Sequence, residues 1–274
     1  MKALQFGQNC ERNDMFDDLS IVIPFRPGTE ERRAIFDWVY CRTLLTLPGA
    51  EVIVASDTRN SQAHFNKSMA INEGVLRASR PVICMLDADL VIDHTTYAAG
   101  LEVLERSSLV VLMSYVRYLS KDASLRLLES NPMQTISELE ASGPRVVGQY
   151  PASVGGAIMF HRDKFIKMGG CDERLVGWGY EDNIFHSVYT ALFGTADRLK
   201  GHIYHIHHSH SPAPSASDYS ESDYFQNEYR LIVANNPVEN NKKIWKEYSE
   251  NIGSPARLVE YIKNNCISPF VKVI

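Results

Sequence analysis

The sequence has few cysteines, no long apolar run and no excess of positive charge. Its five cysteines are an odd number, with no Cys-x-x-Cys pair and no spacing typical of a zinc site, so we expect reduced thiols. No run approaches the ~20 apolar residues that span a bilayer, and no basic-then-apolar leader opens the chain, so we expect a cytoplasmic protein without a transmembrane segment. The net charge of -5 and the scattered lysines and arginines disfavour nucleic acid as a partner without excluding it.

The 274 residues, 45% hydrophobic and 22% charged, are sufficient to bury one large core. The first part of the chain alternates between apolar, β-branched runs and segments with helical spacing. The expected strands are Leu19–Pro24, Glu51–Ser56 and Val82–Leu86, and the helices between them begin near Thr29 and span about Ala63–Ser79. This alternation predicts an α/β fold with a single Rossmann-like, mostly parallel sheet flanked by helices.

The rest of the chain is less regular. The expected elements are a helix near Thr96–Arg106, a buried strand Leu109–Tyr118, a polar helical insert Leu119–Ser142, a short apolar run Ala157–Phe160, an apolar helix opened by Glu181-Asp182 and a strand into His202–His210. We divide the chain into an N-terminal extension (1–18), one domain (19–210) and a helical C-terminal tail (211–274) packed on it. Within the domain, residues 19–95 form the nucleotide-binding half and residues 96–210 the second half.

Two acids, Asp87 and Asp89, come where the strand Val82–Leu86 ends. Ligands of open α/β sheets bind at the carboxyl ends of the strands, and two carboxylates there suit a hard cation that could also neutralise a diphosphate. Arg26 and Lys67, near a strand end and a helix start, are cations that could meet the same diphosphate. The same residues also allow a purely structural interpretation, in which Asp87 caps a helix, Asp89 lies in a turn and the cations are solvated.

A second acidic pair, Glu181-Asp182, follows Trp178 and Gly179. A tryptophan ring can stack on the apolar face of a sugar, a carboxylate can accept a hydroxyl hydrogen bond, and one carboxylate could serve as a general base. The alternative is that both acids merely interact favourably with the dipole at a helix N-terminus.

A third cluster consists of histidines. Its members are His202, His205, His207, His208 and His210. Neutral imidazole suits a divalent transition metal. Side chains alternate between the two faces of a strand, so the five histidines cannot all be ligands of one metal. One histidine could complete a cation site with the two aspartates. A separate zinc site is the alternative, disfavoured because no cysteine or acid partner has the right spacing.

Five stretches in this order resemble metal-dependent glycosyltransferases of the GT-A fold, nearest to the β-1,4-galactosyltransferase and chondroitin-polymerase type. They are IPFRPG at Ile23–Gly28, FNKSMAINEG at Phe65–Gly74, LDADL at Leu86–Leu90, GGCDERLVGWGYED at Gly169–Asp182 and YHIHH at Tyr204–His208. The GWGYED motif after an Asp-x-Asp motif is the specific part of the resemblance.

The resemblance implies a nucleotide-sugar site along the sheet edge. Its members are Pro24, Phe25, Arg26, Asp57, Phe65, Lys67, Asp87, Ala88, Asp89, Gly156, Trp178 and Gly179. By analogy with the family, Asp57 would bind the base or ribose, and Phe65 and Lys67 would border the nucleotide and diphosphate.

The resemblance also implies a metal site and a base. Asp89, helped by Asp87, would hold Mn²⁺ or Mg²⁺ on the diphosphate, with His205 as the first choice for a further ligand and His207 and His208 as alternatives. Asp182 would deprotonate the acceptor hydroxyl, with Glu181 beside it in sugar binding.

The implied activity is an inverting transfer from a UDP-sugar to a hydroxyl group, since one base and one metal suit a single displacement. Two alternatives are a retaining GT-A transferase of the polypeptide N-acetylgalactosaminyl type and a non-catalytic module that binds nucleotide sugars or carbohydrate. Residues 96–210 would serve as the acceptor half. The acceptor could be a glycan, a lipid-linked sugar, a protein or a modified base in viral DNA, and the donor sugar and oligomeric state stay open.

The sequence departs from the family in two places. Pro27-Gly28 stand where the family often has a second arginine after Arg26, and Tyr180 replaces a small residue of the galactosyltransferase motif. The second departure favours the bacterial-polymerase-like branch, and we expect a bacterial or viral enzyme.

Overall fold

The computed structural model describes residues 14–59, 63–151, 154–208, 237–265 and 267–273. Most of the predicted N-terminal extension and the first part of the predicted C-terminal tail lie outside these residues, as does the end of the predicted strand into His210.

A six-stranded sheet forms the centre of the molecule. Its order is β2 (Glu51–Ala55), β1 (Leu19–Pro24), β3 (Val82–Leu86), β8 (Ala157–His161), β5 (Leu109–Val111) and β9 (Ala196–Arg198). Only β8 runs antiparallel to its neighbours. The predicted mixed α/β fold with a mostly parallel sheet is therefore confirmed.

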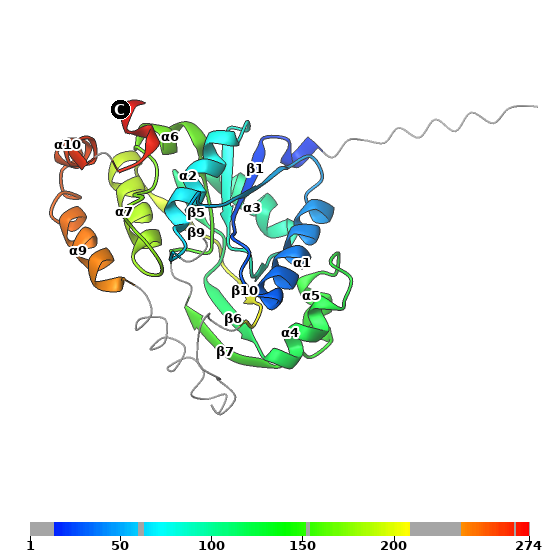
Figure 1. Ribbon diagram of the computed structural model, residues 1–274. Helices are drawn as coiled ribbons and strands as arrows, with labels where there is room; N and C mark the ends of the chain where they lie inside the picture. Colours follow the sequence, from blue (N-terminus) through cyan, green and yellow to red (C-terminus); the bar gives the residue numbers. More distant parts are fainter. Residues whose placement is uncertain (1–13, 60–62, 152–153, 209–236, 266, 274) are drawn as a thin grey trace, which may run out of the picture.

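Helices lie on both sides of this sheet (Figure 1). They are α1 (Glu30–Thr46), α2 (Lys67–Arg77), α3 (His94–Leu104), α4 (Lys121–Leu128), α5 (Ile136–Ala141), α6 (Arg162–Lys167), α7 (Glu181–Phe193), α9 (Val238–Ser249) and α10 (Pro255–Asn265), with short 3-10 helices η1 (Asp14–Phe16) and η2 (Pro269–Val273). Side-chain caps fix four of the starts, at Thr29, Asn66, Ser120 and Thr135. Thr29 accepts a hydrogen bond from Arg32 N at 3.2 Å, and Asn66 accepts one from Met69 N at 2.9 Å. None of the described helices is both long and apolar enough to cross a membrane.

The central strands are covered on both faces, which explains their continuous apolar sequences. Every residue of β1 is buried. Helix α2 lies so close to this strand that a Cβ added at Gly74 would be 2.4 Å from Cγ1 of Val22. This packing fixes the first residue of α2, Lys67, beside the carboxyl end of β3, where its Nζ is 2.9 Å from Asp87 Oδ1.

A second sheet of four strands was not predicted. Its order is β4 (Leu90–Val91), β10 (His202–His205), β6 (Tyr115–Leu119) and β7 (Val146–Pro151). The prediction of one strand over Leu109–Tyr118 is wrong, because the chain leaves the large sheet after β5. The backbone N–H groups of Ser114 and Tyr115 both donate to Gly201 O, at 3.0 and 3.1 Å, which directs β6 into the second sheet beside β10.

The C-terminal helices pack against α7 on its side away from the sheet (Figure 1). A buried carboxylate ties them to the loop that precedes α7. Asp172 accepts hydrogen bonds from Tyr248 of α9 at 3.1 Å and from Arg174 at 2.7 Å, and Arg174 donates to the hydroxyl of Tyr261 in α10 at 2.7 Å. The loop that carries the GWGYED motif therefore rests on the last part of the chain.

Candidate active site and metal centre

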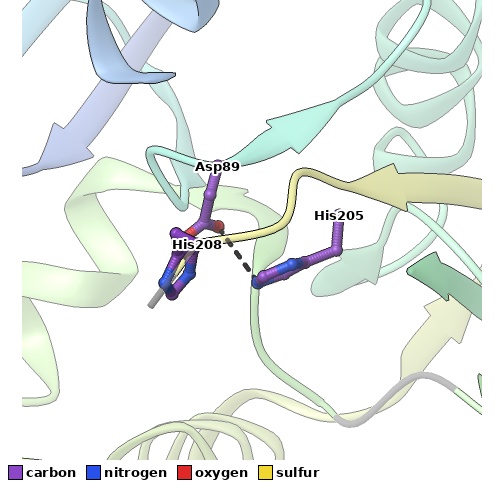
Figure 2. Close-up of side chains that lie close together, drawn as sticks. All are labelled: Asp89, His205 and His208. Atoms are coloured by element: carbon purple, nitrogen blue, oxygen red, sulfur yellow. Dashed lines mark ion pairs between the residues drawn. The ribbon is translucent and has the colours of Figure 1, made fainter. Parts of the chain in front are cut away.

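Three side chains form a candidate metal centre at the end of β3. One oxygen of Asp89 and one nitrogen each of His205 and His208 lie within 4.8 Å of one another (Figure 2). His208 Nε2 is 3.2 Å and His205 Nε2 is 3.7 Å from the carboxylate of Asp89. One carboxylate and two imidazoles are a donor set that suits Mn²⁺ and related divalent ions, so these residues fit the predicted cation.

Strand pairing explains why the histidines reach Asp89. β10 runs antiparallel to β4 with His205 opposite Leu90, and Ile206 N donates to Asp89 O at 2.9 Å. The strand ends at His205, so the alternation expected for an extended strand does not continue beyond it. As a result His208 turns back to Asp89, whereas the backbone N–H of His207 donates to Ser124 Oγ at 2.8 Å. Of the described histidines, His205 and His208 therefore belong to the candidate metal centre, and His207 does not.

An arginine that the sequence analysis did not single out also contacts the centre. Arg32 Nη1, from the first turn of α1, lies 2.8 Å from Asp89 Oδ2. Burial would raise the pKa of Asp89, but His205, His208 and Arg32 outweigh it and hold that pKa well below its usual range. Asp89 is therefore ionised at neutral pH and ready to bind a cation.

Asp87 points to a different neighbour. Lys67 Nζ lies between Asp87 and Asp182, at 2.9 Å from the former and 3.2 Å from the latter. Burial would lower the pKa of Lys67, yet the two carboxylates raise it well above its usual value. Burial also raises the pKa of Asp87 to about 6 against the opposing charge of Lys67. Lys67 thereby joins the two acidic motifs of the sequence in one ionic cluster, and the role of Asp87 as a metal ligand stays a prediction.

The acidic pair opens α7. Glu181 Oε2 accepts a hydrogen bond from Gly179 N at 2.8 Å, and burial together with the charge of Asp182 raises the pKa of Glu181 to about 7. Asp182 fills the space next to Gly155, where an added Cβ would be 1.8 Å from Asp182 Oδ2. Gly155 is therefore required for the carboxylate of Asp182 to lie where it does. The neighbouring Gly156 accepts a hydrogen bond from Asp87 N at 2.8 Å, which holds the same glycine pair against the end of β3.

The predicted nucleotide side is organised by a buried carboxylate. The side chain of Asp57 is fully buried and contacts Arg26 at 3.2 Å and Arg59 at 3.1 Å. It also accepts a hydrogen bond from Asn66 N at 3.0 Å. The guanidinium of Arg26 lies over the ring of Phe65, 5.5 Å from its centroid. Asp57 thus positions Arg26 and Phe65, and its predicted contact with a base or ribose is not tested by these interactions.

Three other predicted residues lie within the protein. Phe25 stacks on Phe36 with ring centroids 4.0 Å apart and is 5% exposed, and Ala88 between the two aspartates is 4% exposed. Pro24 is the last residue of β1 and is buried. Whatever these three contribute to a nucleotide pocket comes from their packing and backbone.

Trp178 and Gly179 lie in a loop clamped from two directions. Trp178 is 42% exposed. Gly177 N donates to Phe65 O at 2.9 Å, which joins the loop to the predicted nucleotide side. From the other side, the fully buried amide of Asn241 in α9 donates to Val176 O and to Gly179 O, both at 3.0 Å. Sequence reasoning missed Asn241, because a single asparagine on a polar helix gives no signal.

Residues 136–209 match the family described as the N-terminal domain of galactosyltransferase. The matched segment contains the GWGYED motif and both histidines of the candidate metal centre. The match confirms the resemblance inferred from the sequence motifs, and with it the prediction of a glycosyltransferase. A comparison with curated proteins gives no match.

Several solved structures are similar to the chain. The catalytic domain of Drosophila β1,4-galactosyltransferase 7 in complex with xylobiose is 18% identical over 78% of this chain and 78% of that chain, with a TM-score of 0.44. A mutant of that enzyme in complex with manganese, UDP-Gal and xylobiose is 17% identical over 76% and 78%, with a TM-score of 0.46. Glucosyl-3-phosphoglycerate synthase from Mycobacterium tuberculosis, with Mn²⁺, UDP and glucosyl-3-phosphoglycerate, is 13% identical over 79% and 77%, with a TM-score of 0.41.

The clamp by Asn241 leads to a stability prediction. Asn241→Ala leaves the partly buried carbonyls of Val176 and Gly179 without the donor that the buried amide supplies, so the free energy of unfolding should fall by about 1–3 kcal/mol. Urea denaturation measures this, with Asn240→Ala as the control, because Asn240 is the exposed neighbour on the same helix. We expect the control to differ from wild type by less than about 0.5 kcal/mol. Equal losses in both variants would show that the amide of Asn241 does not hold the loop.

The raised pKa of Glu181 predicts a pH dependence of stability in the metal-free protein. Between the ordinary value of 4.5 and the folded value of about 7, the native state retains a proton that the unfolded state loses. The contribution of this group to stability is therefore complete below the ordinary pKa and is lost as the pH rises through the folded one. A Glu181→Gln variant, which cannot ionise, should become more stable relative to wild type as the pH rises from about 5 to about 8.

Chemical denaturation across this pH range tests the prediction, with the exposed Glu250→Gln as the control. We expect the difference between the control and wild type to stay nearly constant. A constant difference for Glu181→Gln as well would show that Glu181 is ionised in the native state throughout the range.

Proposed function

We propose that the protein is an inverting glycosyltransferase that moves a sugar from a UDP-sugar to an acceptor hydroxyl, using a divalent cation held by Asp89, His205 and His208. The observation that supports this most is the convergence of two separate sets of groups at one edge of the sheet. Asp89 belongs to the candidate metal centre, and Asp87 lies two residues before it, directly after β3. Lys67 links Asp87 to Asp182 of the GWGYED motif. A transferase of this kind needs a cation for the leaving diphosphate and a base for the acceptor close together.

The leaving group determines what the first set of residues does. A bound divalent cation supplies Lewis-acid stabilisation of the charge that develops on a departing diphosphate. The chain adds two cations of its own at this place, Arg32 beside Asp89 and Lys67 beside Asp87. Fixed positive groups aimed at developing charge lower the barrier without reorganisation during the reaction. Because Lys67 is held by two carboxylates, it is fully protonated when it meets the diphosphate.

The second set supplies the base. Glu181 is engaged with the backbone of Gly179, and its raised pKa keeps part of it protonated near neutral pH. Asp182 pairs with the ammonium group of Lys67 at 3.2 Å, and a turn of that group toward a bound diphosphate would free the carboxylate. We therefore assign Asp182 as the group that accepts the proton of the acceptor hydroxyl, with Glu181 positioning the sugar. One base and one displacement give inversion at the anomeric carbon.

Ligand-dependent thermal stability tests the proposal. The melting temperature of the full chain is measured with UDP and a panel of UDP-sugars and other nucleotide sugars, each with and without Mn²⁺. A ligand that binds only the folded state raises the melting temperature by mass action, so we expect a rise with UDP-sugars that requires the cation. If no nucleotide sugar stabilised the protein with any divalent ion, the proposal would be contradicted. If one does, the protein is incubated with that donor, and NMR of the product establishes the anomeric configuration.

A further inference from the structure

Tyr118 lies at the candidate metal centre, although no sequence motif and no step of the proposed function assigns it a role. It belongs to β6, which runs parallel to β10 in the second sheet, and it is directly opposite His205 in the register of these two strands. The centroids of the two rings are 4.7 Å apart, and their planes form an angle of 33°. Tyr118 therefore packs against the imidazole ring of a candidate metal ligand.

His205 lies where its own strand ends. β10 stops at this residue, and the chain then approaches α4, where the backbone N–H of His207 donates to Ser124 Oγ at 2.8 Å. The Nε2 edge of the His205 ring faces Asp89 (Figure 2), but at 3.7 Å this contact is too long to be a hydrogen bond. The ion pair with Asp89 thus does not by itself fix the plane of the imidazole, whereas packing against a second ring restrains that plane.

Tyr118 is itself held from both sides. β6 is an interior strand of the second sheet, paired with β10 on one side and with β7 on the other. The ring of Tyr150 in β7 makes an edge-to-face contact with Tyr118, with centroids 5.8 Å apart and planes at 77°, an arrangement that aromatic pairs prefer. The paired backbone and this second ring give Tyr118 the fixed position that is needed to orient a metal ligand.

The contact continues into the metal centre. The rings of His205 and His208 have centroids 5.1 Å apart, so a displacement of His205 would also change its position relative to the other imidazole. The phenol of Tyr118 lies near the carboxylate as well, because burial and the charge of Asp89 both raise the pKa of Tyr118. Tyr118 is therefore placed beside the ligand group as a whole, on the side of His205.

We infer that Tyr118 is a positioning residue of the metal centre, whose ring holds the imidazole of His205 where it can bind the cation together with Asp89 and His208. The inference rests on the proposed function for the cation itself. Residues that orient metal ligands contribute about 10 to 100-fold to metal affinity, because the ligands are then arranged before the metal binds. The ring of Tyr118 carries this role and its hydroxyl does not, since the contact with His205 is between two rings.

The affinity of the full chain for Mn²⁺ in the presence of UDP tests the inference, and the electron paramagnetic resonance signal of free Mn²⁺ measures it. Tyr118→Leu removes the ring and keeps an apolar side chain, whereas Tyr118→Phe removes only the hydroxyl. Tyr115→Leu is the matched control. Tyr115 lies in the same strand opposite His202, and side chains three residues apart project from opposite faces of a sheet.

We expect Tyr118→Leu to bind Mn²⁺ about tenfold more weakly or worse, and Tyr118→Phe and the control to bind it within about twofold of wild type. Wild-type affinity in Tyr118→Leu would overturn the inference. An equal loss in Tyr118→Phe would also overturn it, because the hydroxyl would then carry the effect. If Tyr118→Leu fails to fold, Tyr118→Met, with an unbranched apolar side chain, takes its place in the same comparison.

A spectroscopic measurement separates positioning from a purely structural role. Co²⁺ bound to the protein absorbs visible light with a spectrum that depends on the geometry of its ligands. We expect the Co²⁺-saturated Tyr118→Leu protein to have an altered spectrum and the Tyr118→Phe protein to have that of wild type. A wild-type spectrum in Tyr118→Leu would show that the ring does not set the geometry of the ligands, and it would refute the positioning role.

The wild-type protein distinguishes failure of this inference from failure of the proposed function. If the wild type does not bind Mn²⁺ with UDP, the proposed function fails and the role of Tyr118 fails with it. If the wild type binds Mn²⁺ and Tyr118→Leu binds it equally well, only the role of Tyr118 is wrong.

Discussion

Replacing Asp89 by alanine should weaken metal-dependent binding of UDP by about 10²-fold or more, since even indirect partners of metal ligands contribute about 10 to 100-fold. Asp89 is the only carboxylate in the described metal group, and removing it leaves two neutral donors for a divalent ion. It also leaves Arg32 without its partner at 2.8 Å. Isothermal titration of UDP with and without Mn²⁺ measures the loss, and we expect turnover to fall with it.

Two comparisons define what the Asp89 result means. Asp37→Ala removes an exposed carboxylate of α1 that pairs with Arg33, and it should leave metal-dependent binding unchanged. Asp87→Asn keeps the size of a side chain that contacts Lys67 instead of the histidines, so we expect a smaller loss of metal affinity than for Asp89→Ala. If Asp89→Ala bound UDP and Mn²⁺ with wild-type affinity, the assignment of Asp89 as a metal ligand would be refuted.

Asp182→Asn should reduce turnover by about 10²–10⁴-fold, the range that general bases contribute, while UDP and Mn²⁺ still bind. The amide keeps the shape of the side chain and cannot accept the hydroxyl proton. Asp197→Asn, an exposed aspartate of β9, is the matched control and should turn over normally. The comparison with Glu181→Gln then identifies the base, since we expect that variant to affect sugar binding more than the rate of the chemical step.

The glycine next to Asp182 allows the same test without changing the carboxylate. A Cβ at Gly155 would collide with Asp182 Oδ2 at 1.8 Å, so Gly155→Ala should displace the base and reduce turnover. Gly253→Ala is the control, because nothing lies within 4 Å of a Cβ added there. A fully active Gly155→Ala protein, or a fully active Asp182→Asn protein, would refute the assignment of Asp182.

The first half of the fold could be predicted because its signals are local. Buried parallel strands are continuous apolar runs, and the expected Leu19–Pro24 and Val82–Leu86 coincide with β1 and β3. The helix predicted from Ala63 begins later, at Lys67, because Asn66 caps it. Strand partners are not local. β4 has two residues and pairs with β10 far along the chain, and no pattern within either segment specifies that pairing.

The candidate site shows the same division between residues with a local sequence signal and residues placed by tertiary packing. Asp89, Asp182 and a histidine at His205 were predicted, because acids after a strand and the motif order carry that signal. The choice of His208 over His207 depends on where β10 ends, which pairing with β4 and β6 decides. Arg32 and Asn241 gave no signal, because an arginine or an asparagine on a helix acquires its role only when tertiary packing brings another element to it.

The proposed function requires that a divalent cation binds to Asp89, His205 and His208 in contact with a nucleotide diphosphate. Anomalous diffraction at the manganese edge, from crystals of the protein grown with Mn²⁺ and UDP, tests it most directly. We expect one strong anomalous peak within coordination distance of Asp89 and both histidines, next to the diphosphate of UDP. A peak on Glu181 and Asp182, or UDP bound with no metal at Asp89, would contradict it.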